Sequence, residues 1–159
     1  RNPDNSLTAA PPAARTDQGP LMNDPRINLA ALLLRLTLGT MFVAHGLLKY
    51  FVFTPAGTVK FFESLGLPGP LAYLTIAAEV LGGIALLVGY HTRVVASALV
   101  PVLLGAAWAH AGNGWLFSSP NGGWEYPVFM AFTAIAAALL GDGRYALRST
   151  APAPRLATA

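Results

Sequence analysis

The chain has 159 residues, of which 54% are hydrophobic and only 11% are charged, with a formal net charge of +3. Soluble domains carry about 25% charged residues, whereas only seven charged side chains lie between Ile27 and Gly141. So little charge argues against a soluble enzyme, and the dispersed cations do not form the basic patch of a nucleic-acid binder. The chain contains no cysteine, which excludes disulfides, thiol redox centres and cysteine-ligated clusters within it.

Residues 1–25 are predicted to form a flexible tail, because they are rich in proline and alanine and show no apolar period. Four apolar segments follow, each close to the roughly 20 residues that a membrane-spanning helix needs. Only helices satisfy their own backbone hydrogen bonds within a single span of lipid-facing chain. Residues 26–147 are therefore predicted to be an all-α, integral membrane four-helix transmembrane bundle, followed by a flexible tail over 148–159. The predicted spans are 27–48, 70–89, 93–110 and 124–141.

The distribution of Lys and Arg predicts the orientation. These residues gather in the two tails and beside the tight turn at 90–92, which by the positive-inside rule places both termini in the cytoplasm. The first outer loop, residues 50–69, contains an amphipathic stretch at 58–65. This stretch is too short to span a bilayer, so we expect a short interfacial helix.

Aromatic side chains cluster around the second outer loop, residues 111–123. We interpret Trp108, Trp115, Trp124 and Tyr126 as an interfacial aromatic belt. A stacking platform for an aromatic substrate is the alternative.

Two ionisable side chains lie well inside predicted spans, where charge is costly and usually faces the bundle interior. Arg35 lies in the inner half of the first span and Glu79 near the middle of the second. In an antiparallel hairpin their depths are similar, which predicts an intramembrane Arg35–Glu79 ion pair. A proton-handling or ligand site is the alternative.

A second polar set, His45, Lys49, His110 and Glu125, lies at the outer ends of three spans. Such groups could hydrogen-bond the carbonyls of a quinone and handle protons. Two histidines and a carboxylate could also bind a divalent metal, although the neighbouring lysine argues against one. Ordinary polarity at helix ends is the third interpretation. His45 and His110 also close similar outward-running helices, and a duplicated hairpin of this kind occurs in transporters.

The pattern of single residues along the spans resembles the DoxX family of small four-helix membrane proteins. The resemblance covers about residues 27–147 and rests on Leu34-Arg35, Gly39, His45-Gly46, Lys49, Gly66-Leu67-Pro68, Glu79, Gly82-Gly83, Gly89, Thr92-Arg93, Ala109-His110, Gly123-Trp124-Glu125 and Gly141-Asp142-Gly143-Arg144-Tyr145. It implies a four-helix transmembrane bundle in the bacterial inner membrane, associated with redox complexes. Relatives are linked to thiosulfate:quinone oxidoreduction, or resemble partners of a superoxide dismutase and a sulfurtransferase.

Together these observations predict a membrane subunit of a redox complex that faces quinone or lipid. Any enzymatic activity would be quinone-linked and shared with partner subunits, so the expected contacts are lipid, other membrane proteins and quinone, without nucleic acid or metal. A non-catalytic structural accessory subunit is the alternative. A small-molecule transporter is a third, favoured only by the internal repeat.

Overall fold

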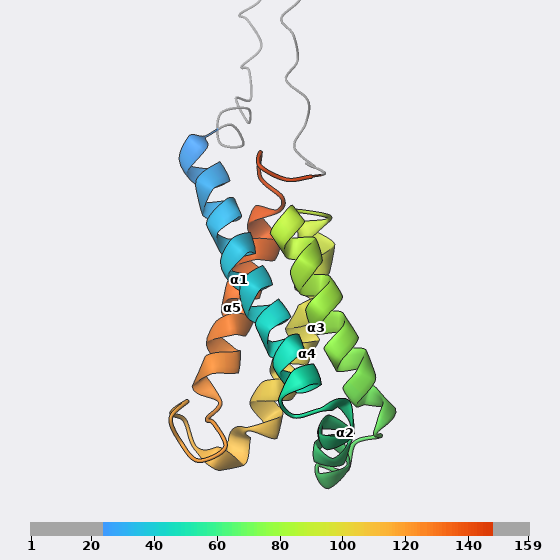
Figure 1. Cartoon of the computed structure of the whole chain (residues 1–159). Helices are drawn as coiled ribbons and strands as arrows, with labels where there is room; N and C mark the ends of the chain where they lie inside the picture. The colour runs from blue at the N-terminus through green and yellow to red at the C-terminus, as the bar shows by residue number, and fades with distance from the viewer. Residues whose placement is uncertain (1–23, 148–159) are drawn as a thin grey trace, which may run out of the picture.

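The computed structural model describes residues 24–147, and the regular secondary structure of this part of the chain is entirely helical (Figure 1). The described residues form four longer helices, one short helix and one 3₁₀ turn, and they contain no strand. This confirms the predicted all-α class. The elements are α1 (Pro25–Phe51), α2 (Pro55–Ser64), α3 (Pro70–Val88), α4 (Thr92–Ala109), η2 (Ala111–Asn113) and α5 (Glu125–Leu140).

The predicted tails over 1–25 and 148–159 lie outside the described residues, apart from the last two residues of the first. There Asp24 caps α1: its side chain accepts a hydrogen bond from the Arg26 amide at 2.8 Å. Pro25 then occupies the first helical turn, where its missing N–H is harmless. The helix thus begins two residues earlier than the apolar run indicated.

Three of the helices, α1, α3 and α4, are long and apolar enough to cross a membrane. The fourth, α5, is equally apolar but has 16 residues, about 24 Å at 1.5 Å per residue. The outward faces carry large apolar side chains, with Leu81, Val94 and Leu139 exposed at 66%, 67% and 75%. A surface of this kind suits contact with lipid.

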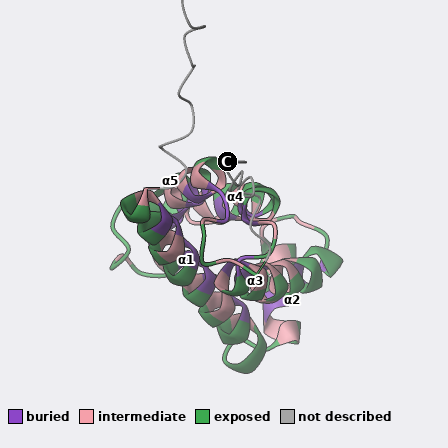
Figure 2. Ribbon diagram, turned by 90° about the horizontal axis from the view of Figure 1, so that it is seen from above, coloured by how far each residue is buried: buried purple, intermediate pink, exposed green. Residues whose placement is uncertain are grey.

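The long helices form a bundle with two distinct ends (Figure 1). At one, here the terminal end, α1 begins and α5 finishes. At the other, here the α2 end, α2 and the 111–123 loop cover the bundle. The main packing pairs are α1 with α3 and α4 with α5, and the buried positions face inward when the bundle is seen from above (Figure 2).

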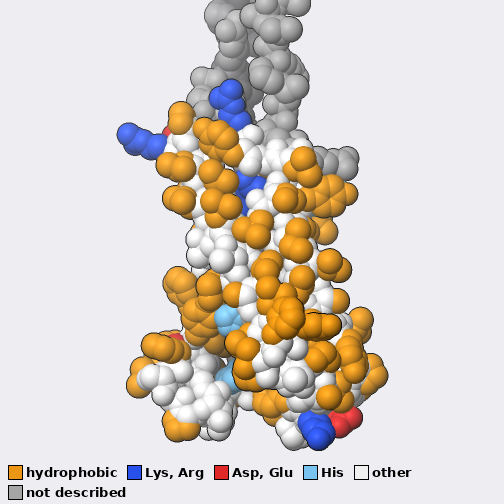
Figure 3. Space-filling model, in the orientation of Figure 1, with side chains coloured by type: hydrophobic (Ala, Val, Ile, Leu, Met, Phe, Trp, Pro, Cys, Tyr) orange, Lys and Arg blue, Asp and Glu red, His pale blue; other side chains and the backbone are white. Residues whose placement is uncertain are grey.

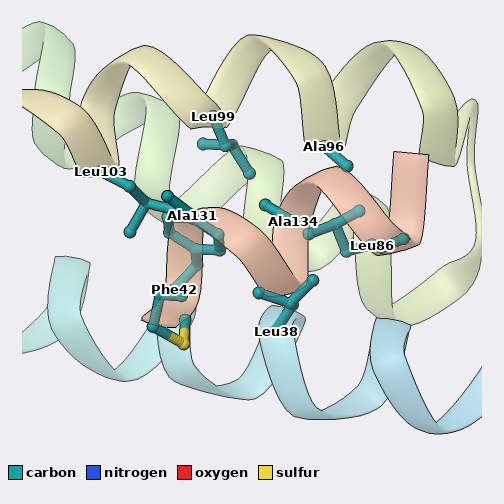
Figure 4. Close-up of a cluster of buried hydrophobic side chains, with 10 residues drawn as sticks. Leu38, Phe42, Leu86, Ala96, Leu99, Leu103, Ala131 and Ala134 are labelled. Carbon is teal, nitrogen blue, oxygen red and sulfur yellow. The ribbon is translucent and has the colours of Figure 1, made fainter. Parts of the chain in front are cut away.

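Small side chains bring these helices close together. The buried core combines large residues such as Leu38, Phe42 and Leu99 with three alanines of α5, Ala131, Ala134 and Ala137 (Figure 4). Between α1 and α3 the closest approach is made by glycines. A Cβ on Gly83 would lie 2.8 Å from the Gly39 carbonyl oxygen, and one on Gly39 would lie 2.8 Å from that of Gly83. Close backbone packing of this kind drives helix association in a membrane, because lipid tails are as apolar as the side chains and give the helices no hydrophobic reason to associate.

The terminal end is fastened by the segment that follows α5, residues 141–147. Its backbone and side chains bond to three other helices. The contacts are Thr92 N to Asp142 Oδ1 at 2.6 Å, Arg35 Nη2 to the Tyr145 carbonyl at 2.6 Å, Arg144 N to Asn28 Oδ1 at 2.7 Å and Leu147 N to the Val88 carbonyl at 2.9 Å. This end is therefore tied together by polar bonds, whereas the α2 end encloses a cavity.

Candidate ligand cavity

A cavity of about 850 Å³ lies in the half of the bundle nearest the α2 end. All four long helices contribute to its walls, and the aromatic side chains of α2, Phe61 and Phe62, also line it. Most of the lining is apolar, and the polar groups are few. Its size falls within the roughly 300–1,000 Å³ of typical ligand pockets, which share this mixture of apolar walls and a few placed polar groups.

An ion pair between α1 and α3 forms one polar part of the wall. Lys49 Nζ lies 2.6 Å and 2.8 Å from the two carboxylate oxygens of Glu79, so it donates to both. The Glu79 side chain is 7% exposed and that of Lys49 is 21% exposed. An ammonium carries three hydrogens, so one remains available to a molecule in the cavity.

His45 contributes a ring nitrogen from the neighbouring turn of α1. Its Nδ1 lies 2.9 Å from the Met41 carbonyl oxygen, four residues earlier. Because a carbonyl only accepts, Nδ1 carries the proton and the neutral ring presents Nε2 as an acceptor. The ring stacks on Tyr126 of α5, with centroids 5.8 Å apart and planes inclined by 20°. Both side chains line the cavity.

His110 reaches the cavity from the other side of the bundle, where α4 ends. Its Nδ1 lies 3.3 Å from the amide nitrogen of Asn113, which also donates to the backbone carbonyls of Asn121 and Gly122 at 3.2 Å and 2.8 Å. Figure 3 shows histidine side chains at the surface toward the α2 end, bordered by hydrophobic ones. His110 and His45 therefore both contribute polar groups to the cavity wall.

Glu125 does not join this set. Its Oε1 accepts a hydrogen bond from the Phe117 amide at 2.8 Å, and its side chain is not part of the cavity lining. The carboxylate lies in the first turn of α5, where it instead ties down the 111–123 loop. The sequence placed Glu125 at the correct end of the bundle but could not show that a loop amide would take up the carboxylate.

The four aromatic residues predicted as an interfacial belt divide into two groups. Trp108 and Tyr126 line the cavity. Trp115 and Trp124 pack edge to face against one another, with centroids 4.4 Å apart, where the 111–123 loop meets α5.

The predicted Arg35–Glu79 pair is wrong, because the two side chains lie at different levels of the bundle. Glu79 packs near Gly46, whereas Arg35 lies against Gly89 at the end of α3. Eleven residues of α1 separate Arg35 from Gly46, about 16 Å along the helix axis. The first turns of α1 extend past the end of α3 (Figure 1), so depth counted from the start of each apolar run was misleading.

Arg35 instead belongs to the hydrogen-bonded contacts that hold residues 141–147 at the terminal end. Its side chain is fully buried, Nη2 donates to the Tyr145 carbonyl, and the charge of Asp142 interacts favourably with it. Its Nε and Nη1 have no hydrogen-bond partner among the described residues. Asp142, which the sequence analysis named only among the residues of the family resemblance, is the acidic neighbour that Glu79 was expected to be.

The cavity thus combines a charged donor, two histidines and a carboxylate with aromatic and aliphatic walls. Within residues 24–147 no three His, Cys, Asp or Glu side chains lie close enough together to hold a metal ion. Such a lining suits an amphipathic organic molecule.

Comparison with known proteins places these residues in a family. Residues 30–112, which include Arg35, His45, Lys49, Glu79 and His110, match the DoxX family. The chain is 34% identical over 119 residues to a protein of Bacillus subtilis (strain 168) named "Putative oxidoreductase CatD", an alignment that covers 75% of this chain and 84% of that protein. No solved structure matches the chain. These matches confirm the resemblance seen in the sequence: the chain is a membrane protein that belongs to the DoxX family.

Proposed function

We propose that this protein is a subunit of a membrane redox complex and binds a quinone in the cavity at the α2 end. The observation that carries the proposal is the cavity itself, which combines about 850 Å³ of mainly apolar space with the polar groups of Lys49, His45 and His110. The name of the Bacillus subtilis relative supports the redox class. In this proposal the membrane is the bacterial inner membrane, the bundle spans it four times, and both ends of the chain face the cytoplasm.

The donors in the cavity fit the chemistry of a quinone head group. Quinone oxygens accept hydrogen bonds, and the Lys49 ammonium offers a charged donor beside Glu79. Trp108, Tyr126 and the phenylalanines of α2 supply flat apolar surfaces for the ring and its tail. A quinone supplies two-electron redox chemistry when bound, and the residues of this chain would hold and orient it.

Partner subunits complete the proposal. The chain has no cysteine with which to hold an iron–sulfur cluster or to relay electrons as thiols. We propose that a partner delivers or removes the electrons, while this subunit contributes the quinone site within the lipid.

The fluorescence of Trp108 offers a direct test, because its side chain lines the cavity whereas Trp115 and Trp124 do not. In the variant that keeps only Trp108 (Trp115→Phe and Trp124→Phe), a short-chain quinone should quench the emission saturably. The matched control, Trp108→Phe with both other tryptophans retained, should show only the linear quenching of a quinone dissolved in the micelle. Equal, linear quenching of both proteins would contradict a quinone site here.

A structural accessory subunit is the second candidate, favoured by the way Lys49 and Glu79 satisfy one another. The two functions differ in what His110→Ala does. A quinone site predicts weaker quinone binding and lower quinone-linked activity with normal assembly into the complex. A purely structural role predicts that quinone-linked activity is unaffected in any variant that assembles.

A further inference from the structure

The two histidines of the cavity present opposite hydrogen-bonding groups. His45 uses its Nδ1 proton on the Met41 carbonyl, so its free Nε2 is an acceptor in the neutral ring. Among the described residues no hydrogen bond engages this Nε2 atom. Stacking on Tyr126 keeps the ring in place, so the acceptor is a fixed feature of the wall.

His110 has the other tautomer, and Asn113 imposes it. The Asn113 Nδ2 atom faces two backbone carbonyls, those of Asn121 and Gly122. Carbonyl oxygens only accept, which fixes the amide so that its nitrogen faces them. The same nitrogen faces His110 Nδ1 at 3.3 Å, and two donors cannot face one another. This contact assigns Nδ1 of His110 as the acceptor, which places the proton of the neutral ring on Nε2.

From this pairing we infer that the cavity preferentially binds the reduced, hydroquinone form of its ligand. The inference rests on the proposed function and specifies which redox form the site takes. Both oxygens of a quinone are acceptors, so they can bond to Lys49 and His110 but leave His45 Nε2 without a donor. One hydroxyl of a hydroquinone can donate to His45 Nε2 and the other to the Glu79 carboxylate, which also lines the cavity, while their oxygens accept from Lys49 and His110.

The size of the preference follows from one hydrogen bond. We expect the hydroquinone to bind about tenfold more tightly than the quinone, which corresponds to about 1.4 kcal/mol. The measurement uses the full chain in lipid nanodiscs under strict exclusion of oxygen, with decyl-substituted benzoquinone and its hydroquinone as the two probes. Binding is measured as the amount of each probe retained by nanodiscs that contain the protein minus the amount retained by empty nanodiscs. This subtraction removes the contribution of probe dissolved in the lipid.

Substitution of His45 tests the stated cause. His45→Phe keeps a flat ring beside Tyr126 but removes the acceptor, so hydroquinone binding should weaken about tenfold while quinone binding stays within about twofold. His45→Gln offers both a donor and an acceptor and should likewise bring the two affinities together. The matched control is His91→Asn at the terminal end, since Asn tolerates the positive φ of 47° there. This control should keep the wild-type preference.

The outcomes separate the two ideas. Saturable binding of both probes with equal affinity would overturn the hydroquinone preference and leave the quinone site standing. A preference that persists unchanged in both His45 variants would also overturn the inference. No saturable binding of either probe would contradict the proposed function itself.

Discussion

The Lys49–Glu79 ion pair provides the sharpest prediction about stability. Removal of Lys49 alone leaves the Glu79 carboxylate, which is 7% exposed, without either of its two hydrogen bonds, since both come from Lys49 Nζ. Loss of one partner of a buried pair typically costs 3–5 kcal/mol. Because Lys49 itself is 21% exposed, we expect the lower limit, about 3 kcal/mol for Lys49→Met. Glu79→Gln still accepts from Lys49 through its amide oxygen and should cost about 1.5 kcal/mol.

The double variant distinguishes a coupled pair from two independent side chains. Replacing both charges removes the unpaired carboxylate, so Lys49→Met with Glu79→Gln should be more stable than Lys49→Met alone. This corresponds to a coupling energy of about 2 kcal/mol. Lys60→Met is the matched control, because Lys60 is an exposed lysine at the same end of the molecule. Its expected effect is below about 0.5 kcal/mol.

The assay is reversible unfolding in mixed detergent micelles, followed by tryptophan fluorescence, with the free energy of unfolding compared among the five proteins. If the double variant loses as much free energy of unfolding as the two single variants lose together, the two side chains are not coupled. An effect of Lys49→Met no larger than that of Lys60→Met would show that Glu79 is not held by Lys49 in the folded protein.

The same assay tests three further contacts. Gly83→Ala should destabilise the protein by about 1–3 kcal/mol, because the new Cβ would lie 2.8 Å from a backbone oxygen of α1. The control Gly105→Ala, with no atom within 4 Å of its Cβ, should be neutral or slightly stabilising. Similar losses of stability in both variants would contradict the close packing of α1 on α3. Arg35→Met should cost about 3 kcal/mol, because it breaks the bond to the segment after α5 and removes the favourable charge interaction with Asp142. Arg35→Lys, which keeps the charge, should lose less, and equal losses would argue against an electrostatic role. Glu125→Ala should cost about 1–2 kcal/mol of stability, because the hydrogen bond to the 111–123 loop is lost. Proteolysis within this loop should also become faster. An unchanged cleavage rate would show that other contacts hold the loop.

The helices could be predicted from the sequence because their signals are local. Apolar runs place the boundaries of the four long helices within three residues of those observed, although Pro25, which was assigned to the tail, is the first residue of α1. The short helix in the first loop also appears, as α2, three residues earlier than expected. The largest difference at a helix end is in α1, which continues three residues beyond the predicted span, through Lys49 and Tyr50 to Phe51.

The partners of the charged residues could not be predicted, since they depend on the register between helices. Composition and depth identified Arg35, Lys49 and Glu79 as the groups that needed partners. The overhang of α1 beyond α3 decides which of them meet, and it follows from the glycine contacts of Gly39 and Gly83 rather than from hydropathy. The cavity could not be predicted either, because its walls come from five separate helices. The contact of Asn113 with His110 belongs to no recognisable sequence motif.

The central claim, that the cavity at the α2 end holds a quinone, is tested most directly by photo-crosslinking. The full chain in nanodiscs is irradiated with an azido-quinone, and the labelled residues are located by peptide mass spectrometry. The account predicts labelling concentrated on cavity residues such as Met41, Phe62 and Met130, and suppressed by excess unlabelled quinone. Labelling confined to outward-facing residues such as Leu81 and Leu139, and insensitive to competition, would contradict it.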